Sequence, residues 1–292
     1  MSQRQFGFIG LGQMGGPMAG NISGKGFPLI VYDKAGTQAL APKGTVLAED
    51  AVEVARTTDT IFFSVPDGQV SLNLIDEIIG STERRTSVII DLSTIGPVAA
   101  REAHERCIAE GITYIDAPVS GGQAGARAGT ITVMLAGPKA VVEAHNDILH
   151  GFAKNPFHVG DEPGQGQALK ILNNFLSGTA MVATTEAILY GLSQGLDFKT
   201  MLDVVNVSTG QNTATADKFP NRILTEMFDA GFATALVTKD INLFLENAEK
   251  AGTPTKIAKA ITEVWDATNA ALPGSDFTQV YKYLRDGEGE KE

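Results

Sequence analysis

The chain has 292 residues, of which 43% are hydrophobic and 20% are charged, and its formal net charge is −11. This composition is typical of a globular protein, and the length favours two domains over one. The acidic balance argues against a nucleic-acid or anionic-membrane partner, so an anionic substrate needs local hydrogen-bond donors at its site. The single cysteine, Cys107, excludes an internal disulfide, and we expect it to fill a helix face.

The sequence predicts neither a leader peptide nor a metal site. The first residues lack the basic segment and apolar segment of a leader peptide, and no run reaches the ~18 apolar residues of a membrane span. We therefore expect a cytoplasmic protein without a membrane partner. The histidine positions do not have the spacing of metal ligands, so no metal is expected.

The first element is an apolar run, Phe6–Ile9, that leads into the turn Gly10-Leu11-Gly12-Gln13-Met14-Gly15 and a helix over about 13–23. Gly10 permits a tight turn, Gly12 lets a pyrophosphate approach the backbone, and Gly15 permits close packing of helix on strand. The N–H groups that open the helix favour phosphate. This context predicts a dinucleotide-binding site, with a purely structural turn as the alternative.

A second strand, Leu29–Tyr32, leads to Asp33, eighteen residues after Gly15. A carboxylate there can accept hydrogen bonds from the ribose hydroxyls of NAD and repels the 2′-phosphate of NADP. We therefore predict NAD as the cofactor. The neighbouring Lys34 could hold that phosphate, which leaves NADP possible, and an exposed loop carboxylate is the structural alternative for Asp33.

Apolar runs then alternate with helical segments, which predicts a parallel sheet covered by helices on both faces. The predicted strands are 45–47, 60–65, 87–91, 113–116, 130–135 and 157–159, and the helices between them are 35–43, 50–56 and 70–79. The run 130–135 alternates in polarity, which indicates antiparallel pairing. Val65, Pro66 and Thr94 follow parallel strands and are predicted to flank the cofactor. The alternative for Ser93 and Thr94 is a helix cap before Pro97.

A second glycine-rich segment runs from Asp116 to Gly122. Successive N–H groups from Ser120, Gly121 and Gly122, with the Ser120 hydroxyl, make a concavity suited to a substrate carboxylate. The alternative is an ordinary loop.

From about residue 160 no strand is predicted. Residues 168–194 are predicted to form one long apolar helix of ~27 residues, about 40 Å, and further helices are predicted near 198–207, 218–225, 238–251, 255–270 and 277–284. We therefore predict an α/β dinucleotide-binding (Rossmann) domain over 1–162 and an all-helical domain over 163–292, with a frayed tail at 286–292. An apolar helix of this length also favours a homodimer or homotetramer.

The start of the long helix carries Lys170, Asn173 and Asn174. Lys170 and Asn174 are four residues apart and project from the same helix face. One interpretation is a solvated helix start. The other is catalytic, because a lysine whose pKa is lowered by desolvation can take the proton of a substrate hydroxyl during hydride transfer. Asn174 would then orient the substrate.

Five segments together resemble the β-hydroxyacid dehydrogenases, the group of 3-hydroxyisobutyrate dehydrogenase and tartronate semialdehyde reductase. They are Gly7–Gly15 with Pro17-Met18-Ala19 and Asn21, Asp116–Gly122 with Gly125-Ala126 and Gly129-Thr130, Gly164-Gln165-Gly166, Lys170 with Asn173-Asn174, and Lys239-Asp240. The resemblance covers essentially the whole chain.

The resemblance implies a Rossmann domain, a helical domain, an oligomer and no metal. By position, Lys170 resembles the catalytic lysine of the family, Asn174 its substrate-orienting asparagine and Ser120-Gly121-Gly122 its carboxylate-binding turn. Lys239 resembles a lysine on the cofactor side, with an ordinary exposed lysine as the alternative. The segment Ser208–Thr213 is expected to border the substrate.

The function that these features predict is reversible NAD(P)-dependent oxidation of a small anionic 3-hydroxy acid to its semialdehyde. Candidate substrates are 3-hydroxyisobutyrate, glycerate, a 4-hydroxybutyrate-like acid and serine. An imine reductase is an alternative, but related imine reductases usually carry Asp or Tyr at the position of Lys170. The other alternative is a non-catalytic cofactor-binding interaction module, which would be expected to lack that lysine.

Overall fold

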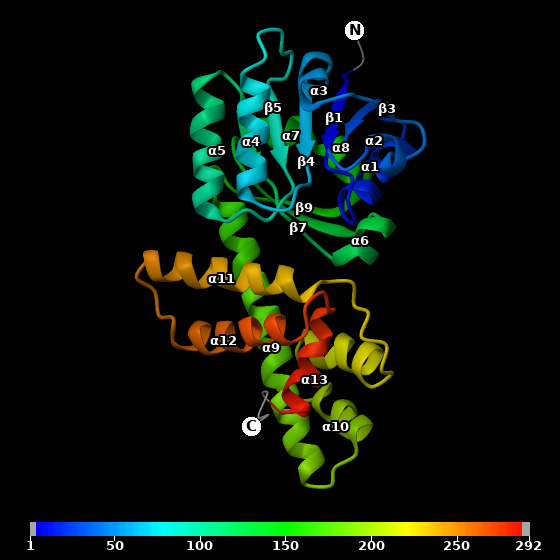
Figure 1. Cartoon of the computed structure of the whole chain (residues 1–292), viewed down its shortest axis with the longest axis vertical. Coiled ribbons are helices and arrows are strands. Elements are labelled where there is room, and N and C mark those ends of the chain that lie inside the picture. Colours follow the sequence, from blue (N-terminus) through cyan, green and yellow to red (C-terminus); the bar gives the residue numbers. More distant parts are fainter. Residues whose placement is uncertain (1–3, 288–292) are drawn as a thin grey trace. The chain divides into compact units, whose positions relative to one another are not determined.

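The structure, a computed structural model, describes residues 4–287 (Figure 1). The chain forms two compact units, residues 1–170 and residues 171–292. Unit 1 is an α/β unit, and unit 2 is helical. Most of the tail predicted to fray lies outside the described residues.

Unit 1 contains one sheet with the strand order β3-β2-β1-β4-β5-β6-β8-β7, and β9 pairs with β8. The strands are β1 (Phe6–Ile9), β2 (Leu29–Tyr32), β3 (Val46–Leu47), β4 (Thr60–Phe63), β5 (Val88–Asp91), β6 (Thr113–Asp116), β7 (Val119–Ser120), β8 (Ile131–Ala136) and β9 (Ala153–Gly160). The first six are parallel, whereas β8 is antiparallel to β6 and β7. The predicted sheet, with its antiparallel exception, is confirmed.

Helices cover both faces of this sheet because successive strand residues point to opposite sides. Phe62 belongs to one hydrophobic core, whereas its neighbours Ile61 and Phe63 belong to the other. The helices are α1 (Gly15–Gly24), α2 (Thr37–Leu40), α3 (Ala51–Thr57), α4 (Gly68–Ile79), α5 (Pro97–Ala109), α6 (Gly122–Ala128), α7 (Lys139–Ala144) and α8 (Asn146–Phe152). Cys107 is fully buried in the second core, as predicted for a residue that fills a helix face. Helix α6 and the two-residue strand β7 were not predicted.

Unit 2 is built from helices that pack around Trp265, Phe219 and Ile241. They are α9 (Gln165–Ser193), whose first six residues belong to unit 1, α10 (Phe198–Val205), the π-helix η1 (Ala214–Ile223), α11 (Thr234–Lys250), α12 (Lys256–Ala271), the 3₁₀ turn η2 (Phe277–Gln279) and α13 (Val280–Arg285). The predicted long helix is confirmed. The sequence was expected to hold no run long and apolar enough to span a membrane, but by length and mean hydropathy α9 passes that test, as the core helices of soluble proteins also do.

The start of η1 differs from the prediction, which placed a helix at 218–225. The Asn212 side chain accepts hydrogen bonds from the backbone N–H groups of Ala214 and Thr215, at 2.8 and 3.1 Å. These N–H groups are the ones a helix start leaves without partners. The helix therefore begins four residues earlier, and Asn212 has a structural role.

Candidate cofactor and active site

The three glycines of the first turn have different roles in unit 1. Gly10 has a φ of +95°, and a Cβ on it would collide with the backbone oxygen of Ser64. A Cβ on Gly15 would collide with the backbone oxygen of Gly10, whereas a Cβ on Gly12 would meet nothing within 4 Å. Gly10 and Gly15 are therefore required by the fold. Gly12 leaves open space beside the backbone, which fits the approach of a pyrophosphate.

The Asp33 carboxylate holds this turn in place. Its Oδ2 accepts a hydrogen bond from the backbone N–H of Leu11 at 2.5 Å, and its Oδ1 accepts one from the N–H of Ala35 at 2.7 Å. Each oxygen keeps a second lone pair that can accept from a hydroxyl group. Asp33 thus lies against the glycine-rich turn, where a carboxylate fits the ribose of a dinucleotide, and Lys34 beside it is exposed.

The carboxyl ends of β4 and β5 are joined through Ser93. The Ser93 hydroxyl accepts a hydrogen bond from the N–H of Val65 at 2.8 Å, and the Ser93 N–H donates to the buried Asp91 carboxylate at 2.9 Å. Helix α5 has Gly96 as its N-cap and no side-chain cap, so the interpretation of Ser93 and Thr94 as a helix cap is wrong. Val65, Pro66 and Thr94 all follow these two strands.

The second glycine-rich turn is held by the sheet. Ser120 pairs with Thr132 in the antiparallel ladder between β7 and β8. Gly121 and Gly122 have φ angles of +133° and +62° and are exposed, so their N–H groups border an accessible turn. The carboxylate-binding role of Ser120-Gly121-Gly122 stays a prediction, and the structure places these residues in an exposed turn after β7.

A side-chain hydrogen bond joins the two glycine-rich turns within unit 1. Gln123, just after Gly122, donates from its amide to the side-chain oxygen of Gln13, which follows Gly12. The predicted pyrophosphate turn and the predicted carboxylate turn are therefore linked by a side-chain contact within unit 1.

The first turn of α9 is anchored to the ends of β5 and β6. The Asp116 carboxylate accepts hydrogen bonds from the N–H groups of Gly164 and Gln167, both at 2.9 Å. The Gln167 side chain accepts from the N–H groups of Ile95 and Gly96, at 2.9 and 3.1 Å, and donates to the Ser93 carbonyl at 2.9 Å. We call Asp116 and Gln167 together the α9 anchor.

Lys170 lies one turn after Gln167 on α9 and is only 8% exposed. Lysine is rarely buried to this extent without a specific role, because its ammonium group loses hydration. The interpretation as a solvated helix start is therefore wrong for Lys170.

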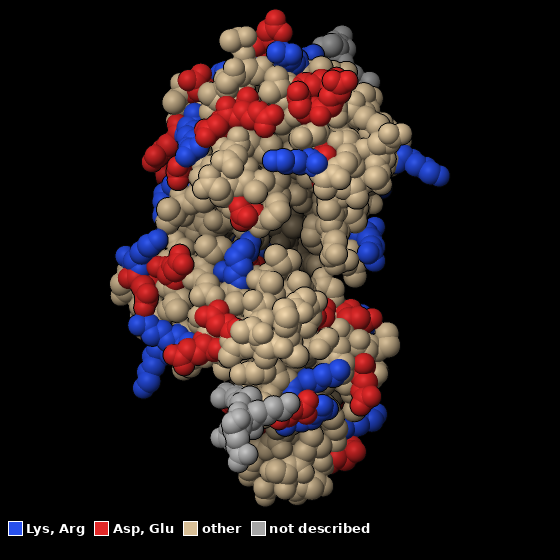
Figure 2. All heavy atoms as spheres, viewed as in Figure 1, with Lys and Arg blue, Asp and Glu red and all other residues tan. Residues whose placement is uncertain are grey.

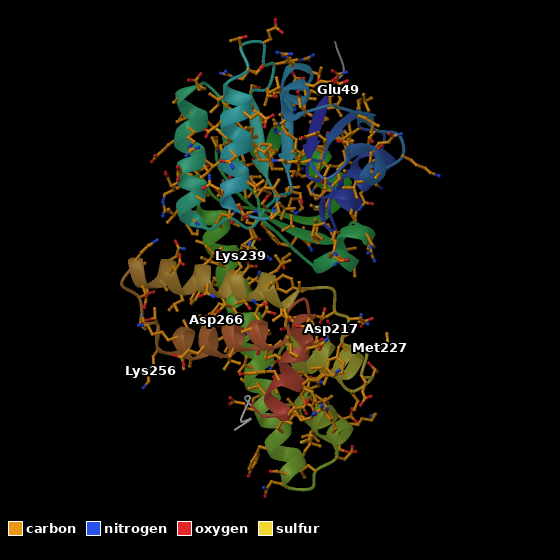
Figure 3. All side chains as sticks on the ribbon, in the orientation of Figure 1. Glu49, Asp217, Met227, Lys239, Lys256 and Asp266 are labelled. Atoms are coloured by element: carbon orange, nitrogen blue, oxygen red, sulfur yellow. The ribbon has the colours of Figure 1, made fainter. Side chains whose placement is uncertain are left out.

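In unit 2, Asn174 takes part in a buried polar cluster with Asp240 of α11. The Asn174 amide donates to Asp240 Oδ2 at 2.5 Å, and Asn173 donates to the Asn174 side-chain oxygen at 3.1 Å. Asn174 and Asp240 are 6% and 3% exposed. Lys239 projects from α11 (Figure 3), with its Nζ 3.4 Å from Asp240 Oδ1. Asp240 therefore fixes which way the Asn174 amide faces.

Burial raises the pKa of Asp116 from 3.8 to about 6, despite the opposing effect of its two N–H donors. The folded protein thus binds this proton more tightly than the unfolded chain. The stabilising contribution is fully present below about pH 4 and is lost as the pH rises through about 6.

We expect the free energy of unfolding of the wild type, relative to Asp116→Asn, to fall by about 1 kcal/mol or more between about pH 5 and 7.5. Urea denaturation of both proteins across this range measures the difference. If the free energies of unfolding of the two proteins changed equally with pH, the raised pKa of Asp116 would be contradicted.

The structure places the predicted site residues in one or the other of the two units. Three further polar residues beside them were not predicted from the sequence. Asp33, Ser120 and the glycine-rich turns lie in unit 1 with Lys170, whereas Asn173, Asn174 and Lys239 lie in unit 2. The residues missed are Gln123, Gln167 and Asp240. Asp240 was noted only as part of the Lys239-Asp240 motif in a predicted helix, and its burial was not predicted.

Acidic and basic side chains are interspersed on the face drawn in Figure 2. Within residues 4–287, no group of three or more His, Cys, Asp or Glu side chains is placed to hold a metal ion.

Family models match both halves of the chain. The NAD binding domain of 6-phosphogluconate dehydrogenase matches residues 5–160, and the NAD-binding domain of NADP-dependent 3-hydroxyisobutyrate dehydrogenase matches residues 164–284. The 2-(hydroxymethyl)glutarate dehydrogenase of Eubacterium barkeri is 34% identical, over 95% of this chain and 94% of that protein. The 3-hydroxyisobutyrate dehydrogenase of Pseudomonas aeruginosa is also 34% identical, over 95% and 97%.

Solved structures agree with these matches. Mycobacterium tuberculosis 3-hydroxyisobutyrate dehydrogenase with L-serine superimposes with a TM-score of 0.88 at 28% identity, over 97% of this chain and 99% of that one. Psf3 in complex with NADP⁺ and 2-OPP has a TM-score of 0.80 at 27% identity, over 96% and 99%. An imine reductase of Streptomyces aurantiacus, 19% identical with a TM-score of 0.64 over 96% and 99%, shares the fold alone. The chain therefore belongs to the β-hydroxyacid dehydrogenase family and is an NAD(P)-dependent hydroxyacid dehydrogenase.

Proposed function

We propose that this enzyme reversibly oxidises the primary hydroxyl of a small 3-hydroxy acid to the semialdehyde, with Lys170 as the general acid and base. The observation that carries the proposal is the burial of Lys170 on a helix whose start is hydrogen-bonded to the carboxyl ends of β5 and β6. Parallel α/β sheets bind their ligands at these strand ends.

The proposed chemistry assigns one task to each group. The Ser120-Gly121-Gly122 turn holds the substrate carboxylate, and Asn174, one helical turn from Lys170, orients the reacting hydroxyl. In the oxidation, neutral Lys170 takes the hydroxyl proton at its Nζ while the carbon loses a hydride and becomes a carbonyl. The bound nicotinamide supplies the hydride acceptor. In the reverse direction the Lys170 ammonium returns the proton to the carbonyl oxygen.

NAD is the proposed preferred cofactor. The Asp33 carboxylate lies against the glycine-rich turn and would repel a 2′-phosphate. The exposed Lys34 is positively charged and could instead attract that phosphate, which leaves NADP possible. Lys239 remains a predicted cofactor contact, and its ion pair with Asp240 limits the directions its amino group can take.

An imine reductase is the less favoured alternative, because this chain has Lys170 at the position where related imine reductases usually carry Asp or Tyr. A non-catalytic cofactor-binding module is disfavoured by the same residue, because such a module would be expected to lack this lysine.

The test is absorbance at 340 nm with a panel of 3-hydroxyisobutyrate, glycerate, 4-hydroxybutyrate and serine, each with NAD and with NADP. We expect turnover with at least one acid and a higher kcat/KM with NAD. A preference for NADP would contradict the Asp33 argument. Turnover of imines without any hydroxy acid would favour the alternative.

We also propose a homo-oligomer that forms through α9. Leu169, Leu172, Leu176 and Tyr190 recur at helical spacing on one face of α9 and are 37% to 68% exposed. A second copy that presents the same stripe would bury these side chains from water.

Leu176→Glu is expected to shift the protein towards the monomer in sedimentation-velocity experiments, because it places a charge in the exposed stripe that the proposed interface would bury. Val207→Glu is the matched control, since Val207 is 87% exposed and lies outside α9. A monomeric wild type, or an equal shift in both variants, would contradict the α9 interface.

A further inference from the structure

We infer that Asp116 and Gln167, the α9 anchor, are positioning residues for the reaction: they fix the first turn of α9 on the ends of β5 and β6 and thereby fix where Lys170 projects. This inference rests on the proposed role of Lys170. It adds a function for two buried side chains that do not themselves carry out proton or hydride transfer.

The Asp116 carboxylate uses both of its oxygens on α9. Oδ1 accepts from the N–H of Gly164 just before the helix, and Oδ2 accepts from the N–H of Gln167 in its first turn. A helix start leaves these N–H groups without intrahelical partners, and a capping residue of the same segment normally accepts from them. Here the cap comes from β6, so the cap also attaches the helix to the sheet.

Close backbone packing accompanies the cap. A Cβ on Gly166 would lie 2.8 Å from Asp116 Oδ2 and 3.0 Å from the Asp116 carbonyl oxygen. Gly166 therefore brings the helix backbone directly onto the end of β6.

Gln167 supplies the second attachment, at the end of β5. Its side chain is fully buried and makes three hydrogen bonds to the backbone of Ser93, Ile95 and Gly96. The same Ser93 binds the N–H of Val65 at the end of β4. The helix start is thereby tied to the strand ends that are predicted to flank the cofactor.

The anchor also relates Lys170 to the predicted substrate turn. Lys170 follows Gln167 by one helical turn, and Ser120 follows Asp116 by four residues and is held in β7 by its pairing with β8. Proton transfer depends closely on the position of Lys170 relative to the substrate that this turn is proposed to hold, since a displacement of about 1 Å can lower the rate roughly a hundredfold.

The carboxyl group of Asp116 fits a role in positioning the helix better than a role in stabilising the fold. Burial raises the pKa of its carboxyl to about 6, so the charged form costs folding free energy at neutral pH. Asparagine would avoid that cost but has only one acceptor oxygen, which leaves one of the two N–H groups facing an NH₂ group. Only the carboxylate satisfies both N–H groups.

The experiment is a double-mutant cycle between Asp116→Asn and Lys170→Ala, with kcat measured at saturating substrate and cofactor. We expect Asp116→Asn to lower kcat by about ten- to a hundredfold in the wild-type background and to have almost no effect in the Lys170→Ala background. The dissociation constant of the cofactor should change little. Gln167→Met, which keeps the side-chain volume and removes the hydrogen bonds, should behave in the same way and serves if Asp116→Asn does not fold.

Asp50→Asn is the matched control. Asp50 caps α3 by accepting from the N–H of Glu53 at 2.7 Å, so the same substitution is made at a helix start that carries no predicted reacting group. Its kcat should match the wild type. An unchanged kcat in both anchor variants, or an equal loss in both backgrounds, would overturn the inference. A wild-type kcat in Lys170→Ala would instead overturn the proposed function, so the two failures are distinguishable.

Discussion

Replacement of Lys170 by alanine is expected to lower kcat by about 10²–10⁴-fold, the usual contribution of general acid–base catalysis. The dissociation constant of NAD should change little, because the predicted cofactor contacts are made mainly by the glycine-rich turn and Asp33. Stopped-flow measurement of hydride transfer and calorimetric titration with NAD separate the two quantities.

Two further variants sharpen this result. Lys170→Arg keeps a positive charge but cannot release its proton near neutral pH, so we expect it to be as inactive as Lys170→Ala. Lys199→Ala is the control, because Lys199 is an exposed lysine on α10 paired with Asp203. Substantial activity in Lys170→Arg would show that Lys170 acts only as a charge.

The second large effect is expected at Gly12. Gly12→Ala should fold with a nearly unchanged free energy of unfolding, since its Cβ would meet no protein atom within 4 Å. The methyl group would occupy the space of the pyrophosphate, at a cost of about 1–3 kcal/mol, so NAD binding should weaken roughly ten- to a hundredfold. Calorimetric titration with NAD measures the loss.

Gly24→Ala is the matched control for that variant. Gly24 ends α1, and its Cβ would also meet no atom within 4 Å, but it lies at the opposite end of the helix from the turn. It should bind NAD like the wild type. Unchanged affinity in Gly12→Ala would contradict the placement of the pyrophosphate at this turn.

The sequence predicted the parts of the fold that depend on local pattern. The strand β6 was predicted at its observed bounds, and the glycine-rich turn after β1 has the strand and helix around it that its spacing requires. The long apolar run after residue 164 likewise becomes a single helix. In each case hydrophobic periodicity and glycine placement act within a few residues.

The parts that were missed depend on contacts between distant segments. Helix α6 has three glycines or alanines in succession with no apolar periodicity, so only its packing against α1 reveals it. The hydrogen bonds of Gln167 join residues more than seventy positions apart. Asp240 is 66 residues from Asn174, and no local pattern relates the two. Such pairings follow from tertiary packing, which the sequence pattern does not encode locally.

The central claim is that hydride passes from the hydroxyl-bearing carbon of a small 3-hydroxy acid to the nicotinamide cofactor. The most direct test uses 3-hydroxyisobutyrate carrying two deuterium atoms on that carbon, with mass spectrometry of the reduced cofactor. We predict that each molecule of NADH formed carries one deuterium and that oxidation is slower than with unlabelled substrate when hydride transfer limits the rate. Reduced cofactor without deuterium, or no reduction by any 3-hydroxy acid of the panel, would contradict the account.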